Sequence, residues 1–183
     1  MTDSIRPQTI LDFWFTEIDS KLWWAKSAAF DALITERFAQ VHAQANCGAL
    51  VDWRDTAQGR LAEIIVLDQF SRNMFRDTPR AFASDTLALV LAQEAIRAGC
   101  HLDVPENMRG FMFLPFMHSE SALMHERALA LYTELGEPNQ LDFEHKHKRI
   151  IERFGRYPHR NAILGRVSTE AELVFLQEVD SAF

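Results

Sequence analysis

The chain has few of the features that crosslink a protein or anchor it to a membrane. It contains two cysteines, Cys47 and Cys100, and neither belongs to a CxxC motif or another metal-binding spacing. Two free thiols in a reducing compartment are the simplest interpretation. The N-terminal sequence lacks the basic start and apolar run of a signal peptide, and no apolar stretch approaches the roughly 18 residues of a membrane span. We therefore expect a cytoplasmic protein without a membrane partner.

An excess of basic residues is also missing. The 183 residues include 19 Lys and Arg against 26 Asp and Glu, which gives a formal net charge of −7. Non-specific nucleic-acid binding requires a broad basic surface, so we expect no nucleic-acid partner. A composition of 48% hydrophobic and 25% charged residues is that of an ordinary globular protein. The length predicts a single domain over residues 1–183.

Strand patterns are scarce, and apolar residues recur at helical spacing along most of the chain. Several residues are suited to the N-cap position of a helix. They are Thr56, Ser119 and Thr169, which forms a capping box with Glu172, and either Thr78, followed by Pro79, or the competing Ser84. Helices are expected to open near Pro105 and Pro138 as well. Residues placed to end helices are Gly48, Gly99, Gly136 and Gly155, and Pro115 should end or kink the helix that contains it.

These helices are expected to pack as antiparallel pairs. Helix–loop–helix units of about 30 to 40 residues, joined by Gly and Pro, are typical of helical-repeat proteins. The stretch 128–138 has the small, aromatic, Gly and Pro residues of a tetratricopeptide (TPR) second helix, although no full repeat is visible. The sequence predicts an all-α fold of about seven to nine helices, stacked in a TPR-like right-handed arrangement.

Arginines gather in two places. Subtracting the four lysines from 19 basic residues leaves 15 Arg, and eight of these fall within 72–80 or 149–166. Residues 70–76 and 154–161 echo each other, because each combines aromatic residues with an Arg-Asn pair beside turn-forming residues. An acidic protein that concentrates its guanidinium groups in this way is expected to build a polar site.

The first Arg-rich segment contains Asp68, Arg72, Asn73 and Arg76. On a helix, Asp68 and Arg72 are i,i+4 neighbours and can form an ion pair. Asp68 is also in phase with apolar residues, so it is expected to be partly buried and to need a partner. These four residues are candidates for ligand binding, and the alternative for the Asp68–Arg72 pair is an internal clamp that orders a loop.

The second segment follows Pro115. There, His118 and Glu120 are expected at the mouth between two helices. A histidine acts as a general acid or base near neutral pH, and a carboxylate can fix its tautomer. Both residues are candidates for catalysis. The alternative for Glu120 is a structural role in the first helical turn, where the macrodipole favours a carboxylate.

The third segment, residues 145–166, contains Arg156, His159, Arg160 and Asn161. Cations near a helix C-terminus are favoured electrostatically, which explains part of the arginine density. A rigid turn at Pro158 followed by His, Arg and Asn presents hydrogen-bond donors from a loop, where functional residues are often found. We take His159 as a catalytic candidate and the other three residues as binding candidates.

The same segments resemble a known family. The motifs are ILDFWF at 10–15, LDQFSRNMFR at 67–76, TPRAFASD at 78–85, FLPFMHSE at 113–120 and HKRIIERFGRYPHRNAILGR at 147–166. They resemble the DUF924 family of uncharacterised, mostly bacterial proteins with a TPR-like helical fold. The resemblance spans nearly the whole chain. It implies a single α-helical domain and no particular reaction.

Three functions are compatible with these residues. The first is a binding module whose arginines hold an anionic small molecule or peptide group, since guanidinium groups suit such anions. The second is a hydrolase with His118 or His159 as general base on a phosphorylated or carboxylated substrate. The third is a purely structural network. We expect no cofactor. A version of the hydrolase that binds a metal ion through Asp68, His118, Glu120 and His159 has no diagnostic ligand spacing to support it. The sequence leaves the oligomeric state open.

Overall fold

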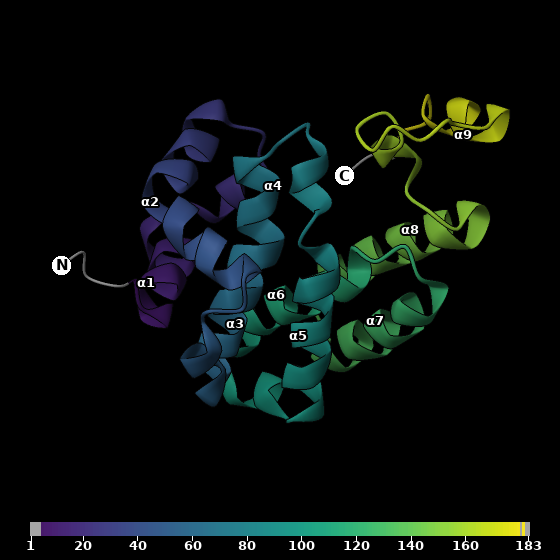
Figure 1. Cartoon of the computed structure of the whole chain (residues 1–183). Helices are drawn as coiled ribbons and strands as arrows, with labels where there is room; N and C mark the ends of the chain where they lie inside the picture. Colours follow the sequence, from purple (N-terminus) through teal and green to yellow (C-terminus); the bar gives the residue numbers. More distant parts are fainter. Residues whose placement is uncertain (1–4, 180, 182–183) are drawn as a thin grey trace.

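The fold is described by a computed structural model that covers residues 5–179 and 181. These residues form the helices α1 to α9 and contain no strand, which confirms the all-α prediction. The two outer layers are α1 (Pro7–Asp12) with α2 (Ala28–Asn46), and α7 (Ala122–Leu135) with α8 (Pro138–Phe154) (Figure 1). Between them lie α3 (Ala57–Ile65), α5 (Asp85–Arg97) and α6 (Glu106–Met117). The short helices are α4 (Ser71–Met74) and α9 (Glu170–Phe175). Successive helices α6, α7 and α8 pack in pairs as expected, and the TPR-like stacking stays a prediction.

One helix runs through the middle of the molecule. It consists of α3, a π-helical turn at Val66–Phe70, and α4, without a break in the chain. Every residue from 61 to 71 is buried, because α1, α2, α5 and α6 pack around this helix. A helix enclosed on all sides must pair each polar side chain that it carries. The central helix is therefore the origin of the buried ion pairs described below.

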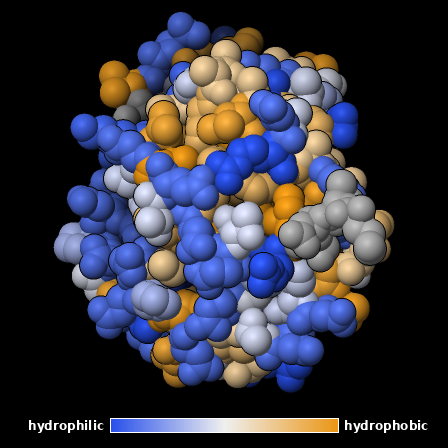
Figure 2. Space-filling model, turned by 90° about the vertical axis from the view of Figure 1, so that its left-hand side faces the viewer, coloured by the Kyte–Doolittle hydropathy of each residue, from blue (hydrophilic) through white to orange (hydrophobic). Residues whose placement is uncertain are grey.

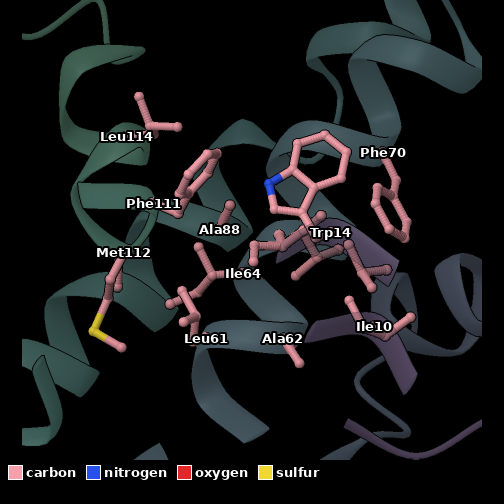
Figure 3. Close-up of a cluster of buried hydrophobic side chains, with 14 of the residues drawn as sticks. Ile10, Trp14, Leu61, Ala62, Ile64, Phe70, Ala88, Phe111, Met112 and Leu114 are labelled. Atoms are coloured by element: carbon pink, nitrogen blue, oxygen red, sulfur yellow. The ribbon is translucent and has the colours of Figure 1, made fainter. Parts of the chain in front are cut away.

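The hydrophobic core fixes the central helix relative to its neighbours. Trp14 is fully buried in a π-helical turn that extends α1, and its ring lies between Phe70 and Phe111 (Figure 3). Its ring centroid is 5.5 Å from that of Phe70 and 6.0 Å from that of Phe111. Tilted and edge-on aromatic pairs of this kind add about 0.5–1.5 kcal/mol each to the burial energy. The core thus holds the central helix and α6 at a fixed separation.

Most predicted helix ends are confirmed. Gly136 and Gly155 end α7 and α8 in the left-handed region, at φ values of 74° and 68°, where a side chain would be strained. Thr56 accepts a hydrogen bond from the backbone N–H of Gly59, and the capping box of Thr169 with Glu172 is present. These signals are local, which is why the sequence alone locates them.

Two predicted helix boundaries change. Pro115 does not end its helix, since α6 continues to Met117. The loss of one hydrogen bond near the helix end is tolerated because all residues from Gly110 to Met117 are buried. Ser119 does not cap the following helix either. The N-cap of α7 is Ser121, so Glu120 lies in the connection before the helix.

Between α4 and α5 both predicted starts occur. Thr78 precedes a single 3-10 turn, Pro79–Phe82. Ser84 then occupies the N-cap position of α5. Two short elements therefore occupy a stretch in which the sequence suggested one helix.

The surface on the side of α1 and α2 mixes hydrophilic and hydrophobic residues (Figure 2). Single exposed apolar side chains are normal on a folded protein. Across residues 5–179 and 181, none of the helices combines the length and the apolar character that crossing a membrane requires.

Candidate functional site

A cleft of about 310 Å³ lies where α5, the end of α6 and the turn after α8 meet. Its polar lining residues include Asp85, His118, Ser119, Glu120 and Arg160. Its apolar lining residues are Pro79, Phe82, Ala83, Leu89, Pro115 and Leu164. The cleft therefore offers charged groups and a hydrophobic surface to the same small molecule.

A continuous series of polar and charged side chains connects the central helix to this cleft. We call it the polar chain, and its members in order are His118, Asp68, Arg72, Asp85 and Arg160. His118 Nδ1 lies 2.8 Å from Asp68 Oδ1, and Arg72 NH1 lies 3.2 Å from the same oxygen. Arg72 binds both oxygens of Asp85, at 3.0 and 3.2 Å, and Arg160 NH1 reaches Asp85 Oδ2 at 3.3 Å. The three segments predicted from the sequence therefore meet.

Asp68 fixes the tautomer of His118. Asp68 is almost completely buried, and although burial raises its pKa, the charge of Arg72 and the hydrogen bond from His118 hold that pKa well below its usual range. The carboxylate is ionised and accepts hydrogen bonds, so the proton on His118 resides on Nδ1. Burial and the nearby Arg72 lower the pKa of His118, which keeps the imidazole neutral at pH 7. Its Nε2 has no hydrogen-bond partner among the described residues and carries the ring's free lone pair, and His118 lines the cleft.

Arg160 is the least compensated cation of the polar chain. Its side chain is 8% exposed, and its Cζ lies 4.6 Å from the ring centroid of Phe82 and 4.5 Å from that of Tyr157. Its Nε is buried without an acceptor, and Arg72 already makes two bonds to Asp85. Burial and the charge of Arg72 accordingly lower the pKa of Arg160, whereas its carboxylate neighbours raise the pKa of Arg72 in spite of burial.

Glu120 lines the cleft but is fully engaged. Its two carboxylate oxygens bind Arg166 at 2.6 and 2.9 Å, and Oε1 also accepts the backbone N–H of Tyr157 at 2.8 Å. Burial raises the pKa of Glu120, but Arg166 and the Tyr157 N–H outweigh it and lower that pKa. Glu120 therefore remains an anion that ties the α6–α7 connection to the turn after α8, and it does not contact His118 in any hydrogen bond among the described residues.

The binding candidates Asn73 and Arg76 lie away from the cleft. Asn73 Nδ2 donates to Asp31 Oδ1 at 2.8 Å. Arg76 makes two bonds to the same carboxylate, at 2.6 and 2.8 Å. Asn73 in α4 and Arg76 just beyond it thus bind to α2, which is the kind of contact that a structural network would make.

The remaining candidates from the third segment also have other partners. Arg156 binds both oxygens of Glu172, at 2.6 and 2.8 Å, and so attaches α9 to the end of α8. Asn161 Nδ2 donates to Ser168 Oγ at 3.0 Å. His159 is not among the cleft-lining residues; its ring lies 5.5 Å from that of Tyr157, and burial lowers its pKa to about 4.

Two residues of the site are missing from the sequence-based candidates. Asp85 joins the two arginines of the polar chain, and its signal was its place in the first turn of α5 within the motif at 78–85. Arg166 neutralises Glu120 from 46 positions away, and nothing local indicates that pairing. Within the part of the chain that the structure describes, no group of three or more His, Cys, Asp or Glu residues could hold a metal ion. Asp68 and Glu120 instead direct their oxygens at arginines.

Comparison with known proteins shows which family the chain belongs to. The chain is similar to a structure described as "Structure of Protein of Unknown Function ATU0120 from Agrobacterium tumefaciens", with 42% sequence identity and a TM-score of 0.89. The match covers 93% of this chain and 96% of that one. No curated protein matches the chain. A family described as "Bacterial protein of unknown function (DUF924)" matches residues 10–180. The chain therefore belongs to the DUF924 family.

Proposed function

We propose that the cleft binds a small organic anion, with its anionic group at Arg160 and its apolar body against the hydrophobic lining. The observation that carries this proposal is the incomplete pairing of Arg160. Among the residues that the structure describes, this buried guanidinium with five donors makes a single hydrogen bond, of 3.3 Å, to an acceptor that it shares with Arg72. A carboxylate or phosphate is the partner that guanidinium geometry suits best.

The other side chains of the polar chain support this assignment. Asp68 and Asp85 supply two negative charges, Arg72 and Arg160 supply two positive charges, and His118 is neutral. These charges sum to zero, but Arg72 contacts both carboxylates whereas Arg160 contacts Asp85 alone, so Arg160 is the less compensated cation where the polar chain reaches the cleft. An incoming anion would therefore complete an alternating series of charges.

The lining favours a ligand with an apolar part. Phe82, Leu89, Pro115 and Leu164 face the same space as Arg160. A volume of about 310 Å³ lies at the small end of ligand pockets. Carboxylates with a short alkyl chain or one aromatic ring fit these two properties better than acetate or inorganic phosphate.

Thermal unfolding with a panel of anions tests the proposal. We expect hexanoate or benzoate to raise the Tm of the wild-type protein more than acetate, phosphate or chloride at equal ionic strength. A ligand at 100 times its Kd stabilises by about 2.7 kcal/mol. Arg160→Gln should abolish the increase, and Arg97→Gln should retain it, because Arg97 pairs with Glu94 on the exposed surface of α5. Equal shifts in Arg160→Gln and wild type would refute the proposal.

A second candidate function is hydrolysis, which the Asp68–His118 pair specifically favours. A neutral imidazole with Nδ1 fixed by a buried carboxylate and Nε2 at a cleft has the arrangement of a general base. In such a reaction Nε2 takes a proton from water as the water oxygen attacks an acyl carbon of the bound substrate. The protonated His118 then donates that proton to the leaving group, and Arg160 stabilises the negative oxygen of the intermediate.

Turnover of an acyl ester built on the bound acid tests this second function. We expect His118→Gln and Asp68→Asn to lower kcat by about 10²-fold or more, the usual contribution of a general base. His145→Gln is the matched control, since His145 is an exposed histidine of α8. Hydrolysis at the wild-type rate in His118→Gln would leave the binding proposal standing and remove the catalytic one.

A further inference from the structure

The carbonyls of the two residues that flank His118 are held by buried side chains, one from α7 and one from the turn after α8. Tyr157 Oη donates to the carbonyl of Met117 at 2.5 Å. His125 Nε2 lies 2.9 Å from the carbonyl of Ser119. Tyr157 and His125 are both fully buried. The backbone on either side of His118 is thus fixed by groups that do not touch the cleft.

The hydrogen bonds around His125 determine its protonation. The carbonyl of Ser119 can only accept, and the proton of Tyr157 Oη, 3.2 Å from His125 Nε2, is already donated to Met117. Nε2 must therefore carry a hydrogen. The other ring nitrogen, Nδ1, lies 2.8 Å from Glu144 Oε1. With a neutral ring and an ionised Glu144, two lone pairs would face each other across this distance.

A second proton removes this conflict. It can reside on His125 Nδ1 beside an ionised Glu144, or on Glu144 Oε1 beside a neutral imidazole, and in both forms the pair is uncharged as a whole. Glu144 is completely buried, and its Oε2 has no hydrogen-bond partner, so a bare carboxylate would be costly here. Burial raises the pKa of Glu144, which agrees with a proton retained by the pair.

Among the described residues, no neighbouring charged group supplies Glu144 with a hydrogen bond that could take the place of the shared proton. Lys148 and His145 act on Glu144 electrostatically from α8, but Lys148 binds Glu126 and Glu152. The other titratable or charged groups that interact with the pair are Tyr132, His147, Glu152 and Tyr157. None of them donates a hydrogen bond to Glu144 in a contact that the described structure contains.

We propose that Tyr157, His125 and Glu144 are positioning residues for His118, and that they hold its backbone only while the His125–Glu144 pair keeps its shared proton. The importance of this device for function rests on the proposed role of the cleft and of His118. The mechanism itself is a property of the free protein. When the shared proton leaves, Nδ1 and Oε1 repel each other, and the hold of His125 on the Ser119 carbonyl weakens.

The direction of the pH effect follows from the proton balance. In the unfolded chain, His and Glu have pKa values of about 6.5 and 4.3. By pH 8 the imidazole there is therefore neutral and the Glu carboxyl is ionised, so both titrating protons are gone. The folded protein retains one of them. Stability from the shared proton is therefore lost as the pH rises and the folded pair releases that proton, which is the direction that the raised pKa of the Glu144 carboxyl gives.

Glu144→Gln removes the shared proton but can keep the hydrogen bonds of His125. Its amide group can donate a hydrogen to Nδ1 of a neutral imidazole, so the same contacts form without a titrating proton. In histidine-labelled protein, we expect the ring resonance of His118, assigned with His118→Gln, to shift in wild type when the pH is raised above neutral. The pKa of His118 itself is lowered, so this shift does not come from its own titration. In Glu144→Gln the resonance should stay constant.

Two further measurements guard against a variant that does not fold. The nitrogen spectrum of wild-type His125 at pH 7 should show a hydrogen on Nε2, and Tyr157→Phe should shift the His118 resonance. A bare Nε2 on His125, an unmoving His118 resonance in wild type, or the same shift in Glu144→Gln would each overturn the proposal. Because no ligand is present, these outcomes are independent of whether Arg160 binds an anion.

Discussion

At the scale of single residues, the arginines fall into two groups: those with a carboxylate of their own and those that share one. Several arginines each bind both oxygens of one carboxylate, and among the less exposed of these pairs are Arg54–Glu63, Arg76–Asp31, Arg156–Glu172 and Arg166–Glu120. Such pairs attach loops and short helices to the core, as the structural alternative predicted. Arg72 and Arg160 instead share Asp85. Function is therefore assigned to Arg160, where compensation is incomplete.

The pair of Asp31 with Arg76 gives a prediction for stability without function. We expect Asp31→Asn to lower the free energy of unfolding by about 1–2 kcal/mol, because it weakens charge-assisted bonds to Arg76 and Asn73 at a partly exposed site. Ligand-induced changes in Tm should be unaffected. Urea titration measures this loss, with Arg97→Gln as a surface-charge control that should leave stability unchanged. A loss of ligand binding in Asp31→Asn would place this clamp in the site.

The same pair contributes to acid sensitivity. Burial raises the pKa of Asp31, but hydrogen bonds from Arg76 and Asn73 outweigh it and lower that pKa. The stabilisation is therefore complete above the unfolded pKa of about 3.9 and disappears as the pH falls through the lower folded value. In Asp31→Asn this part of the acid destabilisation should be absent.

Residue pairing is predictable from sequence only over short distances. Asp68 and Arg72 are four positions apart on one helix, and their predicted ion pair is present. Arg76 and Asp31 are 45 positions apart, so no pattern along the chain connects them. Ser119 and Glu120 looked like the start of a helix, but Glu120 is engaged by the distant Arg166. Local motifs therefore located the site without revealing which of its residues pair with each other.

At the scale of elements, the start of the central helix packs directly against the backbone of the preceding turn. Gly59 lies in its first turn, and a Cβ atom there would collide with the carbonyl oxygen of Trp53. That oxygen is part of the backbone and cannot rotate away. The close approach of the Val51–Asp55 turn to α3 therefore requires a glycine.

Two glycine substitutions compare this contact with a softer one. Alanine usually stabilises a helix by about 1 kcal/mol relative to glycine. We expect Gly59→Ala to destabilise the protein by about 1–3 kcal/mol in spite of this, since the backbone must move. Gly110→Ala in α6 should cost less, because its Cβ would meet the flexible side chain of Gln140. Chemical denaturation of both variants checks the order, and a Gly59→Ala protein more stable than Gly110→Ala would contradict it.

Helix existence followed from periodicity and capping residues, whereas the π-helical turns did not. The turns at Phe13–Glu17 and Val66–Phe70 continue ordinary helices and leave no capping signal. The second turn carries Asp68, which contacts His118 on α6. π-Helical turns are frequent at functional sites, so this turn supports the candidate Asp68, which the sequence had indicated by its spacing to Arg72.

At the scale of the whole molecule, the site depends on segments that are far apart along the chain. The core around Trp14 joins α1, the central helix and α6. The turn after α8 then brings Arg160 to Asp85, 75 positions away. The motifs of the family resemblance cover each of these segments. Membership of DUF924 and the all-α fold were accordingly predictable, while the route of the polar chain required the three-dimensional structure.

The central claim is that the polar chain ends at an anion-binding cleft, and a crystal structure with bound hexanoate or benzoate tests it most directly. We predict a carboxylate oxygen within about 2.7–3.1 Å of the Arg160 guanidinium, with the apolar body of the ligand against Phe82 and Leu164. A carboxylate bound only elsewhere on the protein, or a cleft that stays free of it at saturating concentration, would contradict the account.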